Sequence, residues 1–449
     1  MSTRKLGVLF ALTVLFLSIS VPSFADSQAR IVRLSQVDGD VQVDRNVGKG
    51  YEKAFINLPL TQGFKVRSGS DGRAEVEFED GTTLRITPGT TIEFSELALR
   101  DSGARASQLI LQTGTAYLNY KGDKPVQEFS VVFGPEKLQL DKASHLRLEM
   151  KDANSTLAVF KGEVEVEGTS GKVEVEKKHS ATFDLAGASQ YTVANNLEPD
   201  PYDDWDKQQE KYHQQYNLSA SSSYSPYAYG GSDLNYYGSF YSIPGYGMMW
   251  QPYLVGAGWD PFMNGAWTWY PGVGYAWISS YPWGWTPYRY GSWTYLQSYG
   301  WFWRPGTSWA GWNTVPRISN ATHGFTSPRP PSVVGQTLVV NRGTLATPVA
   351  GVENRVQLRD GSAGLGIARG SVRDLGKMSR QVERSSMIRG GPQTPSAASA
   401  ARLPSASRMS VSRGAPVSHS SGPSTGGGSR GSASSPRSSA PISQGSTHR

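Results

Sequence analysis

The fold of this chain is decided by residues 74–86, which read Ala-Glu-Val-Glu-Phe-Glu-Asp-Gly-Thr-Thr-Leu-Arg-Ile. Apolar and polar side chains alternate on both sides of Asp80-Gly81, and this period of two is typical of strands with one buried face. Asp-Gly between alternating runs is the strongest short-range signal for a β-hairpin, because both residues tolerate a positive φ. We therefore predict a hairpin here, with Glu75 and Glu77 on its solvent face.

The same alternation extends in both directions, from Ile31 to about Phe183. A second hairpin is predicted across the turn at residues 168–171, because valines alternate with charged residues on either side of it. Short strands at this spacing, without a convincing amphipathic helix between them, predict an all-β domain over residues 26–190. The chain has no cysteine, so disulfides cannot stabilise this domain.

Several segments of this domain carry a family resemblance. They are Leu60-Thr61-Gln62-Gly63-Phe64-Lys65-Val66-Arg67-Ser68-Gly69-Ser70-Asp71-Gly72-Arg73-Ala74-Glu75-Val76, Asp80-Gly81-Thr82, Leu84-Arg85-Ile86-Thr87-Pro88-Gly89-Thr90, Gln112-Thr113-Gly114-Thr115-Ala116-Tyr117 and Ala158-Val159-Phe160-Lys161-Gly162-Glu163-Val164-Glu165-Val166. Together they resemble the FecR domain family over about residues 31–168. The resemblance implies a compact β domain outside the inner membrane, with a wound, solenoid- or sandwich-like course of its strands.

In the best-known members of that family, the domain belongs to transmembrane regulators that relay an outer-membrane siderophore signal to a sigma factor. This chain departs from them, because its apolar run starts almost at residue 1 with no sigma-binding domain before it. The family's usual glycine-threonine-aromatic turn is also replaced by Lys142-Ala143-Ser144-His145. We therefore carry over the fold and the location, and keep envelope signalling only as a second alternative function.

The N-terminal residues have the features of a secretory signal peptide. Basic residues precede an apolar run over residues 6–21, and Ser23-Phe24-Ala25 fits the small-residue cleavage pattern. We predict that residues 1–25 are removed and that the protein is exported to the periplasm or the cell surface, without a transmembrane span in its mature form. An uncleaved anchor is the alternative, although the run is slightly shorter than the ~20 residues that span a bilayer.

Residues 234–312 are a repetitive aromatic segment that contains every one of the thirteen tryptophans except Trp205. Three copies are aligned by Gly238, Gly265 and Gly291 and by Trp250, Trp277 and Trp303, which gives a period of 26 to 27 residues. Each copy is predicted to be a hairpin, because aromatic residues favour strands. Three such hairpins side by side can share one buried face.

Adjacent aromatic residues of a strand point to opposite faces, so these rings cannot all enter one core. The rings of the second face either pack against the β domain or a partner, or form an exposed platform for sugar rings. The residues of this candidate aromatic binding face are Trp259, Trp267, Trp269, Trp277, Trp285, Trp293, Trp301 and Trp303. The segment also resembles an uncharacterised aromatic domain found downstream of FecR domains in soil bacteria, and this resemblance implies no activity.

Residues 191–233 are predicted to be a linker with a short helix, because acidic residues after two prolines suit a first helical turn. Asp200, Asp203, Asp204 and Asp206 could bind calcium, but their spacing lacks the glycine and distal glutamate of a known loop. The six histidines show no metal-ligand spacing, and no nucleophile elbow, phosphate loop or dinucleotide fingerprint is present. We predict no catalytic residue, no metal and no cofactor, and hence a non-enzymatic protein.

Residues 313–449 are rich in Ser, Gly, Pro and Arg and are predicted to be a mostly disordered basic tail, in which Val333 to Val340 and Val352 to Ile367 are the segments that could form local structure. From Arg317 onward there are 17 Lys or Arg against 4 acidic residues, so the tail carries more positive charge than the chain's net +7. Outside the cytoplasm, such a tail would contact anionic envelope polymers or lipid headgroups, whereas nucleic acid is not expected as a partner. A purely solvating role is the alternative.

The sequence therefore predicts an all-β protein with a FecR-like β domain, a small aromatic hairpin module and a long disordered C-terminal tail. The function that we expect is a structural or interaction role in the cell envelope, with an envelope glycan or another envelope protein as the partner. The alternative is a carbohydrate- or cell-wall-binding module that uses its exposed aromatic residues.

Overall fold

The computed structural model describes residues 30–122, 127–169, 171–186, 190–217, 229–256, 258–297, 299–309, 315–342, 361–388 and 401–402. The predicted signal peptide and the part of the predicted tail beyond residue 402 lie outside these residues. Within the described ranges, no helix is long and apolar enough to cross a membrane.

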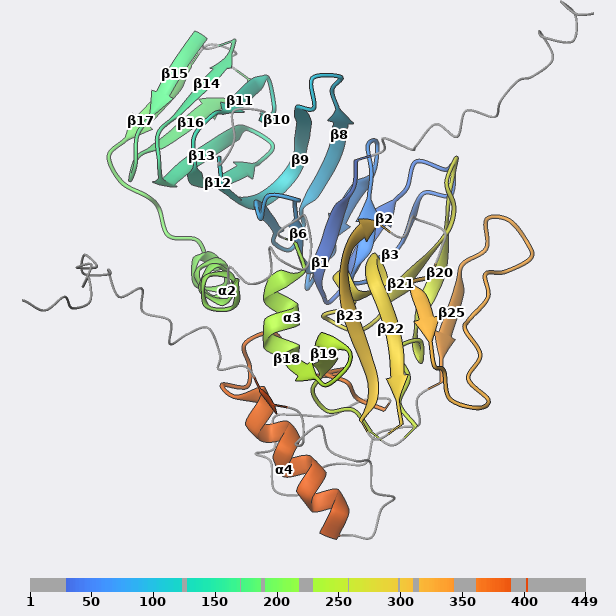
Figure 1. The fold of residues 1–449 in the computed structure, drawn as a ribbon. Coiled ribbons are helices and arrows are strands. Elements are labelled where there is room, and N and C mark those ends of the chain that lie inside the picture. The colour runs from blue at the N-terminus through green and yellow to red at the C-terminus, as the bar shows by residue number, and fades with distance from the viewer. Residues whose placement is uncertain are drawn as a thin grey trace, which may run out of the picture. The chain divides into compact units, whose positions relative to one another are not determined.

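Residues 30–194 fold into two sheets that share one long strand, β9 (Arg105–Tyr120) (Figure 1). The first sheet has the order β4 (Leu58–Leu60), β1 (Val32–Asp38), β6 (Arg73–Glu77), β7 (Thr83–Ile86), β9, β12 (Ser144–Met150), β13 (Asn154–Lys161), β16 (Ser180–Asp184) and β17 (Tyr191–Ala194). The second has the order β3 (Tyr51–Lys53), β2 (Val41–Asp44), β5 (Lys65–Ser68), β8 (Thr91–Leu99), β9, β10 (Gln127–Phe133), β11 (Glu136–Leu140), β14 (Val164–Gly168) and β15 (Gly171–Val175).

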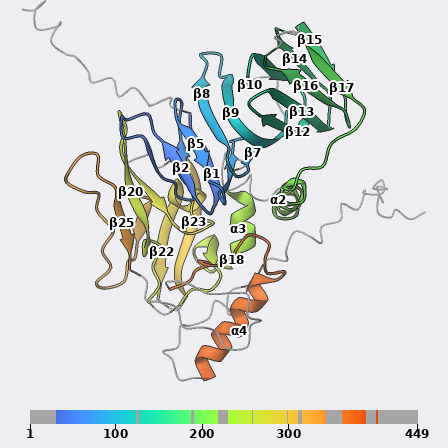
Figure 2. The same cartoon turned by 180° about the vertical axis from the view of Figure 1, so that it is seen from behind.

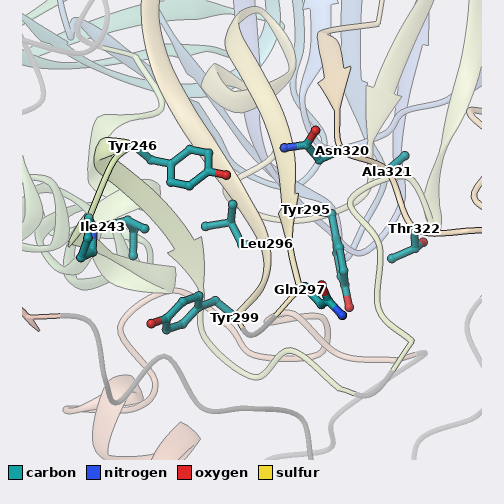
Figure 3. Close-up of a pocket in the computed structure, with 10 residues that line it drawn as sticks. Ile243, Tyr246, Tyr295, Leu296, Gln297, Tyr299, Asn320, Ala321 and Thr322 are labelled. Carbon is teal, nitrogen blue, oxygen red and sulfur yellow. The ribbon is translucent and has the colours of Figure 1, made fainter.

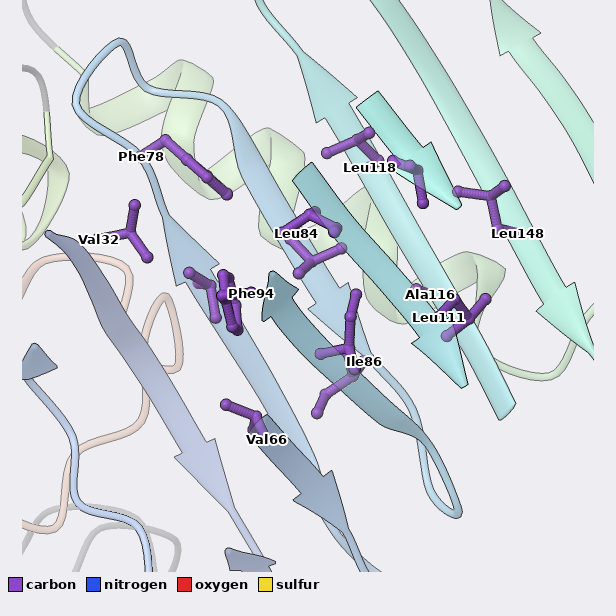
Figure 4. Close-up of a cluster of buried hydrophobic side chains, with 14 of the residues drawn as sticks. Val32, Val66, Phe78, Leu84, Ile86, Phe94, Leu111, Ala116, Leu118 and Leu148 are labelled. Atoms are coloured by element: carbon purple, nitrogen blue, oxygen red, sulfur yellow. The ribbon is translucent and has the colours of Figure 1, made fainter. Parts of the chain in front are cut away.

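Strand β9 belongs to both sheets because its two halves have different neighbours. Residues 105–111 pair with β8 and, in parallel, with β10, whereas residues 114–120 pair with β12. Side chains of both sheets meet in one hydrophobic core, which is shown in Figure 4 and includes Val32, Leu84, Ile86 and Leu118 from the first sheet and Val66 and Phe94 from the second. The predicted all-β fold is confirmed, and the winding of the strands is that of a sandwich.

Both predicted hairpins are present in the sandwich. The first is β6–β7, where Ala74 lies opposite Ile86, and the second is β14–β15, where Val164 lies opposite Val175. Strand β17 still pairs with β16, so the sandwich continues a few residues beyond the predicted boundary at 190. The helix predicted in the linker follows as α2 (Asp203–Tyr216).

The aromatic segment forms the three predicted hairpins after a short helix, α3 (Gly231–Tyr237). The hairpins are β18 (Gly238–Ile243) with β19 (Gly247–Pro252), β20 (Asn264–Tyr270) with β21 (Gly274–Ser279), and β22 (Tyr290–Leu296) with β23 (Gly300–Trp309), the last preceded by the 3-10 turn η2 (Thr286–Tyr288). They do not lie side by side in one sheet as expected. The first and third hairpins share a sheet of order β24-β22-β23-β19-β18-β26, with β24 (Arg317–Ser319) and β26 (Ala401–Arg402), and the second pairs with β25 (Leu338–Asn341) in another.

The glycine and tryptophan of each repeat lie against each other, which explains why they recur together. A Cβ atom on Gly238 would lie 2.2 Å from the indole of Trp250, and one on Gly265 would lie 2.5 Å from the indole of Trp277. The third copy is similar, because a Cβ on Gly291 would lie 2.8 Å from Nε1 of Trp303. Each return strand thus lays its tryptophan across the first strand at a position where any larger residue would clash.

Ordered elements continue beyond residue 312, where the sequence predicted a mostly disordered tail. Strands β24 and β25 extend the two aromatic sheets, and α4 (Leu375–Ile388) packs Leu375 and Met378 into the aromatic cluster. The apolar residues of α4 recur at helical spacing, but the surrounding Ser, Gly and Arg residues conceal this pattern in the composition.

Candidate functional site

Seven of the eight tryptophans of the predicted binding face are buried. Their exposed fractions are 0% for Trp293 and Trp303, 1% for Trp277 and Trp285, 2% for Trp267, 3% for Trp301 and 5% for Trp259, whereas Trp269 is half-buried. These rings therefore do not form an exposed face within the described chain. These rings pack inside the protein. Internal packing was one of the two alternatives that the sequence left open for the rings on the second face of the hairpins.

The second aromatic hairpin is covered on both sides. Ala276 and Ile278 of β21 belong to the same hydrophobic core as the sandwich. Trp277, which alternates with them, belongs to the aromatic cluster, and Ile367 and Leu375 from the later chain join that cluster. The sequence could not show this second cover, because it lies more than fifty residues beyond the last repeat.

Trp283 lies at the centre of the aromatic cluster. Its ring stacks on Tyr281 with centroids 4.9 Å apart and contacts the rings of Trp250 at 4.9 Å and Trp293 at 5.9 Å. Its indole N–H donates a hydrogen bond of 2.8 Å to the carbonyl of Ala363. Each buried tryptophan removes roughly 150 to 250 Å² from water, which stabilises the fold by on the order of 4 to 6 kcal/mol before entropy is counted. The cluster is the core of this domain.

The predicted solvent face of the first sheet is also buried. Glu75 is 0% exposed and Glu77 is 3% exposed. Their face of the sheet is covered by His213 of α2, by Asp233 of α3 and by Arg369, which contact Glu75 or Arg33. Helix α3 lies next to β1 in both views of the fold (Figure 1 and Figure 2). The prediction that these two carboxylates are solvated is wrong. An alternating pattern of charges is the same whether the charges face water or a second layer of charges, so the pattern alone could not separate the two cases.

Glu75 is the centre of this charge layer. Its carboxylate lies 2.8 Å from Nε of Arg85, 2.7 Å from Nη1 of Arg369 and 3.0 Å from Nε2 of His213, and it accepts a hydrogen bond of 2.7 Å from the hydroxyl of Ser35. Burial raises the pKa of Glu75, but the charges of His213, Arg369 and Arg85 outweigh burial and hold the pKa well below its usual value. The carboxylate is therefore ionised when the chain is folded.

A second carboxylate, Asp233 of α3, connects the same layer to the sandwich. It lies 2.7 Å from Nη2 of Arg33 and 2.7 Å from Nη2 of Arg369, and it accepts a hydrogen bond of 2.9 Å from the hydroxyl of Tyr212. Arg33 also pairs with Glu77 at 3.0 Å. Burial raises the pKa of Glu77, and the charge of Arg33 offsets only part of this effect. Arg85 pairs with both Glu75 and Asp206. The layer thus consists of three arginines, Arg33, Arg85 and Arg369, that bridge four buried carboxylates, Glu75, Glu77, Asp206 and Asp233.

Three of the four aspartates considered as a calcium site, Asp200, Asp203 and Asp206, bind side chains of the sandwich, whereas Asp204 pairs with Lys207 of its own helix. Asp206 lies 2.6 Å from Nη1 of Arg85 and 2.7 Å from Nε2 of His145, and Asp203 lies 2.7 Å from Nη1 of Arg147. Burial raises the pKa of Asp206, but these partners outweigh it and lower the pKa. In the parts of the chain that the structure describes, no group of three acidic or histidine side chains could hold a metal ion. These residues fasten α2 to the first sheet.

A second contact zone fastens the β20–β21 hairpin to the edge of the sandwich. The amide of Asn57 donates hydrogen bonds of 2.9 and 2.8 Å to the carbonyls of Ser279 and Tyr281. The ring of Tyr270 stacks on Phe64 with centroids 6.0 Å apart, and its hydroxyl donates to the carbonyl of Pro59 at 2.9 Å. The sandwich and the aromatic domain therefore have a continuous interface of charges, hydrogen bonds and apolar contacts.

The most exposed aromatic ring among the described residues of this segment is Tyr246, which lies at a hairpin turn. Tyr246 in the turn of the first hairpin, and Tyr295 and Tyr299 around the turn of the third, surround an open hollow of about 630 Å³ (Figure 3). Sequence reasoning missed these three tyrosines, because it weighed only residues that recur with the repeat. Their position beside predicted turns was the available signal.

These features define a mostly β protein in which a sandwich carries an aromatic domain on its outer face. Residues 64–165 match the family model described as FecR protein, and residues 231–331 match that of a family of unknown function, DUF6600. The chain therefore has a FecR domain followed by an uncharacterised domain, as the sequence predicted. The second match ends at residue 331, beyond the predicted boundary at 312 and beyond strand β24.

Two crystal structures of a candidate anti-sigma factor from Parabacteroides distasonis ATCC 8503 are similar to part of this chain. The 1.65 Å structure is 16% identical, with a TM-score of 0.25, and the match covers 29% of this chain and 59% of the other. The 2.50 Å structure is 15% identical, with a TM-score of 0.26, and the match covers 36% and 70%. This chain thus spans less than two thirds of the first structure. No curated protein matches it.

Proposed function

We propose that this chain is an exported, non-enzymatic interaction protein of the cell envelope, in which the FecR domain holds the aromatic domain in a fixed position. The observation that carries this proposal is the buried charge layer, in which Glu75, Arg85, Asp233 and Arg369 connect the two domains. Breaking one pair of such a layer leaves an uncompensated buried charge, which typically costs about 3 to 5 kcal/mol. Two domains that moved against each other in a signalling cycle would have to break several pairs at once.

A fixed aromatic domain suits a protein that presents a binding surface. The buried tryptophans make the domain rigid, and the residues that remain for contact with a partner are those at the hairpin turns and on the edge strands. We infer that the partner is an envelope glycan or another envelope protein, and that the basic tail adds contacts with anionic envelope polymers or lipid headgroups. The apolar run over residues 6–21 and the FecR domain support a location outside the cytoplasm.

The FecR domain also keeps the second candidate function open, which is envelope signalling related to FecR regulators. Genes for a sigma factor and a TonB-dependent receptor beside this one would favour that function. The rigid junction described above favours the first.

Cell fractionation combined with mass spectrometry of the protein's N-terminus tests the proposed location. We expect the protein in the periplasmic or surface fraction with a mature N-terminus at Asp26. A cytoplasmic protein that retains Met1 would overturn the proposal. Chemical cross-linking in intact cells, followed by identification of the linked material, then tests whether envelope components contact the aromatic domain.

A further inference from the structure

The hollow between the hairpin turns has the shape of an open groove. Its walls come from three separate segments, which are residues 243–246 of the first hairpin, residues 295–297 with Tyr299 of the third, and residues 320–322 after β24. The described residues that line it are Ile243, Pro244, Tyr246, Tyr295, Leu296, Gln297, Tyr299, Asn320, Ala321 and Thr322. None of these ten residues is charged.

Three phenol rings dominate the groove, as Figure 3 shows. Tyr246 is 41% exposed, and Tyr295 and Tyr299 are half-buried, so each ring keeps part of its surface in water. The buried side chains of Ile243 and Leu296 form an apolar floor beneath them. Aromatic residues with an apolar body and a polar hydroxyl suit a ligand that has both apolar and polar faces.

The polar groups of the groove are amides and hydroxyls. Gln297, Asn320 and Thr322 each have groups that can donate and accept hydrogen bonds. Sugar hydroxyls also donate and accept, and the C–H faces of a sugar ring are apolar, so both kinds of surface in the groove have a counterpart. We infer that this groove binds a neutral oligosaccharide, with sugar rings against the tyrosines and hydroxyls paired with the three polar side chains.

Other ligand classes fit the groove less well. An anionic ligand such as a phosphate or a uronic acid would meet no cation among the lining residues. A polyproline segment also docks on tyrosines, but it offers backbone carbonyls, which accept hydrogen bonds and cannot donate them. Such a segment would therefore make no use of the acceptor oxygens of Gln297 and Asn320.

The two walls of the groove that come from the first and third hairpins are held in place by contacts within the folded chain. The turn that carries Tyr246 is closed by a hydrogen bond of 3.0 Å from its N–H to the carbonyl of Ile243. The carbonyl of Tyr299 accepts a hydrogen bond of 2.9 Å from the amide of Gln251. The ring of Tyr295 contacts that of Trp301 with centroids 5.5 Å apart. A preformed site loses less conformational entropy on binding, which favours useful affinity from few contacts.

Isothermal titration calorimetry of the purified full chain with cellohexaose, chitohexaose and maltohexaose tests this inference. We expect at least one of these neutral hexasaccharides to bind, and Tyr246→Ala to weaken that binding about tenfold because a stacking surface is lost. Tyr246→Phe keeps the ring and should bind nearly as well as the unchanged protein. The matched control is Tyr191→Ala on β17, which removes a tyrosine of similar exposure, 44%, from the sandwich and should leave affinity unchanged.

Three results would overturn the inference. The first is that none of the hexasaccharides binds at millimolar concentration. The second is that the Tyr246→Ala protein binds a hexasaccharide as tightly as the Tyr191→Ala control does. The third is that a polyproline peptide binds in a Tyr246-dependent way and the sugars do not bind. The inference names a ligand class for the proposed interaction function. Calorimetry with purified protein tests the ligand class, whereas cell fractionation tests the proposed location. A failure of one can therefore be distinguished from a failure of the other.

Discussion

Replacing Arg369 with methionine removes a side chain that connects the later chain to both carboxylates at the centre of the charge layer. Arg369 lies 294 residues after Glu75, yet its guanidinium donates hydrogen bonds of 2.7 Å to Glu75 and of 2.8 and 2.7 Å to Asp233, with a fourth of 2.8 Å to the carbonyl of Ser35. Its side chain is 4% exposed. Methionine keeps much of the volume and removes the charge.

The expected loss can be estimated from the partners that remain. Removing one member of a buried ion pair costs about 3 to 5 kcal/mol, because the other charge is left without compensation. Here Glu75 keeps Arg85 and His213, and Asp233 keeps Arg33, so neither carboxylate becomes isolated. We therefore expect the lower end of that range, a decrease of about 3 kcal/mol in the free energy of unfolding.

Urea unfolding followed by tryptophan fluorescence measures this decrease, because all tryptophans except Trp205 belong to the aromatic segment. The matched control is Arg373→Met, four residues further on, where the arginine is exposed. It should change the free energy of unfolding by less than about 0.5 kcal/mol. If the Arg369→Met and Arg373→Met proteins unfold at the same urea concentration, the charge layer does not hold the two domains together and the reasoning is refuted.

Two further predictions concern pH and the repeat. The folded-state pKa values of Glu75, Asp206 and Asp233 are lowered, and only that of Glu77 in this layer is raised. On balance the unfolded chain binds more protons, so the free energy of unfolding should decrease as the pH falls from about 4.5, the ordinary value for glutamate. Urea midpoints measured at several pH values between 6 and 3 give this slope, and a midpoint that does not change would contradict it. Gly265→Ala should destabilise the aromatic domain by about 1 to 3 kcal/mol, because the new Cβ would lie 2.5 Å from the indole of Trp277. Thermal unfolding compares it with Gly256→Ala, where the nearest atom would be 3.8 Å away, and equal melting temperatures would contradict the clash.

Local patterns in the sequence were enough for the hairpins. The β6–β7 and β14–β15 pairs and the three aromatic hairpins follow from alternation, turn residues and the repeat period, all of which act between residues close in the chain. The arrangement of the three aromatic hairpins in two sheets did not follow, because it depends on β24 and β25, which come from outside the repeat.

The burial of Glu75 and Glu77 could not be predicted for a different reason. Their alternation with apolar residues identifies which face of the strand they occupy, but it contains no information about what covers that face. The covering charges come from Asp206, Asp233 and Arg369, each in a segment more than a hundred residues away that gives no sign of contact with this sheet. Long-range charge compensation of this kind leaves no local pattern.

The positions that recur in every copy of the repeat serve packing, and the positions around the groove do not recur in every copy. Its invariant positions, such as Gly265 and Trp277, are occupied by residues that touch each other inside the domain, so repetition here reflects a packing rule. The turns differ in part between the copies. The residue before the first glycine of the return strand is Tyr246 in the first hairpin, Val273 in the second and Tyr299 in the third, and the Pro-Gly pair of the first two turns is absent from the third. A single ligand-binding surface needs one specific set of side chains, and it does not need the same set in all three copies of the repeat. In this domain that requirement is met where the copies diverge, around the groove between the first and third turns.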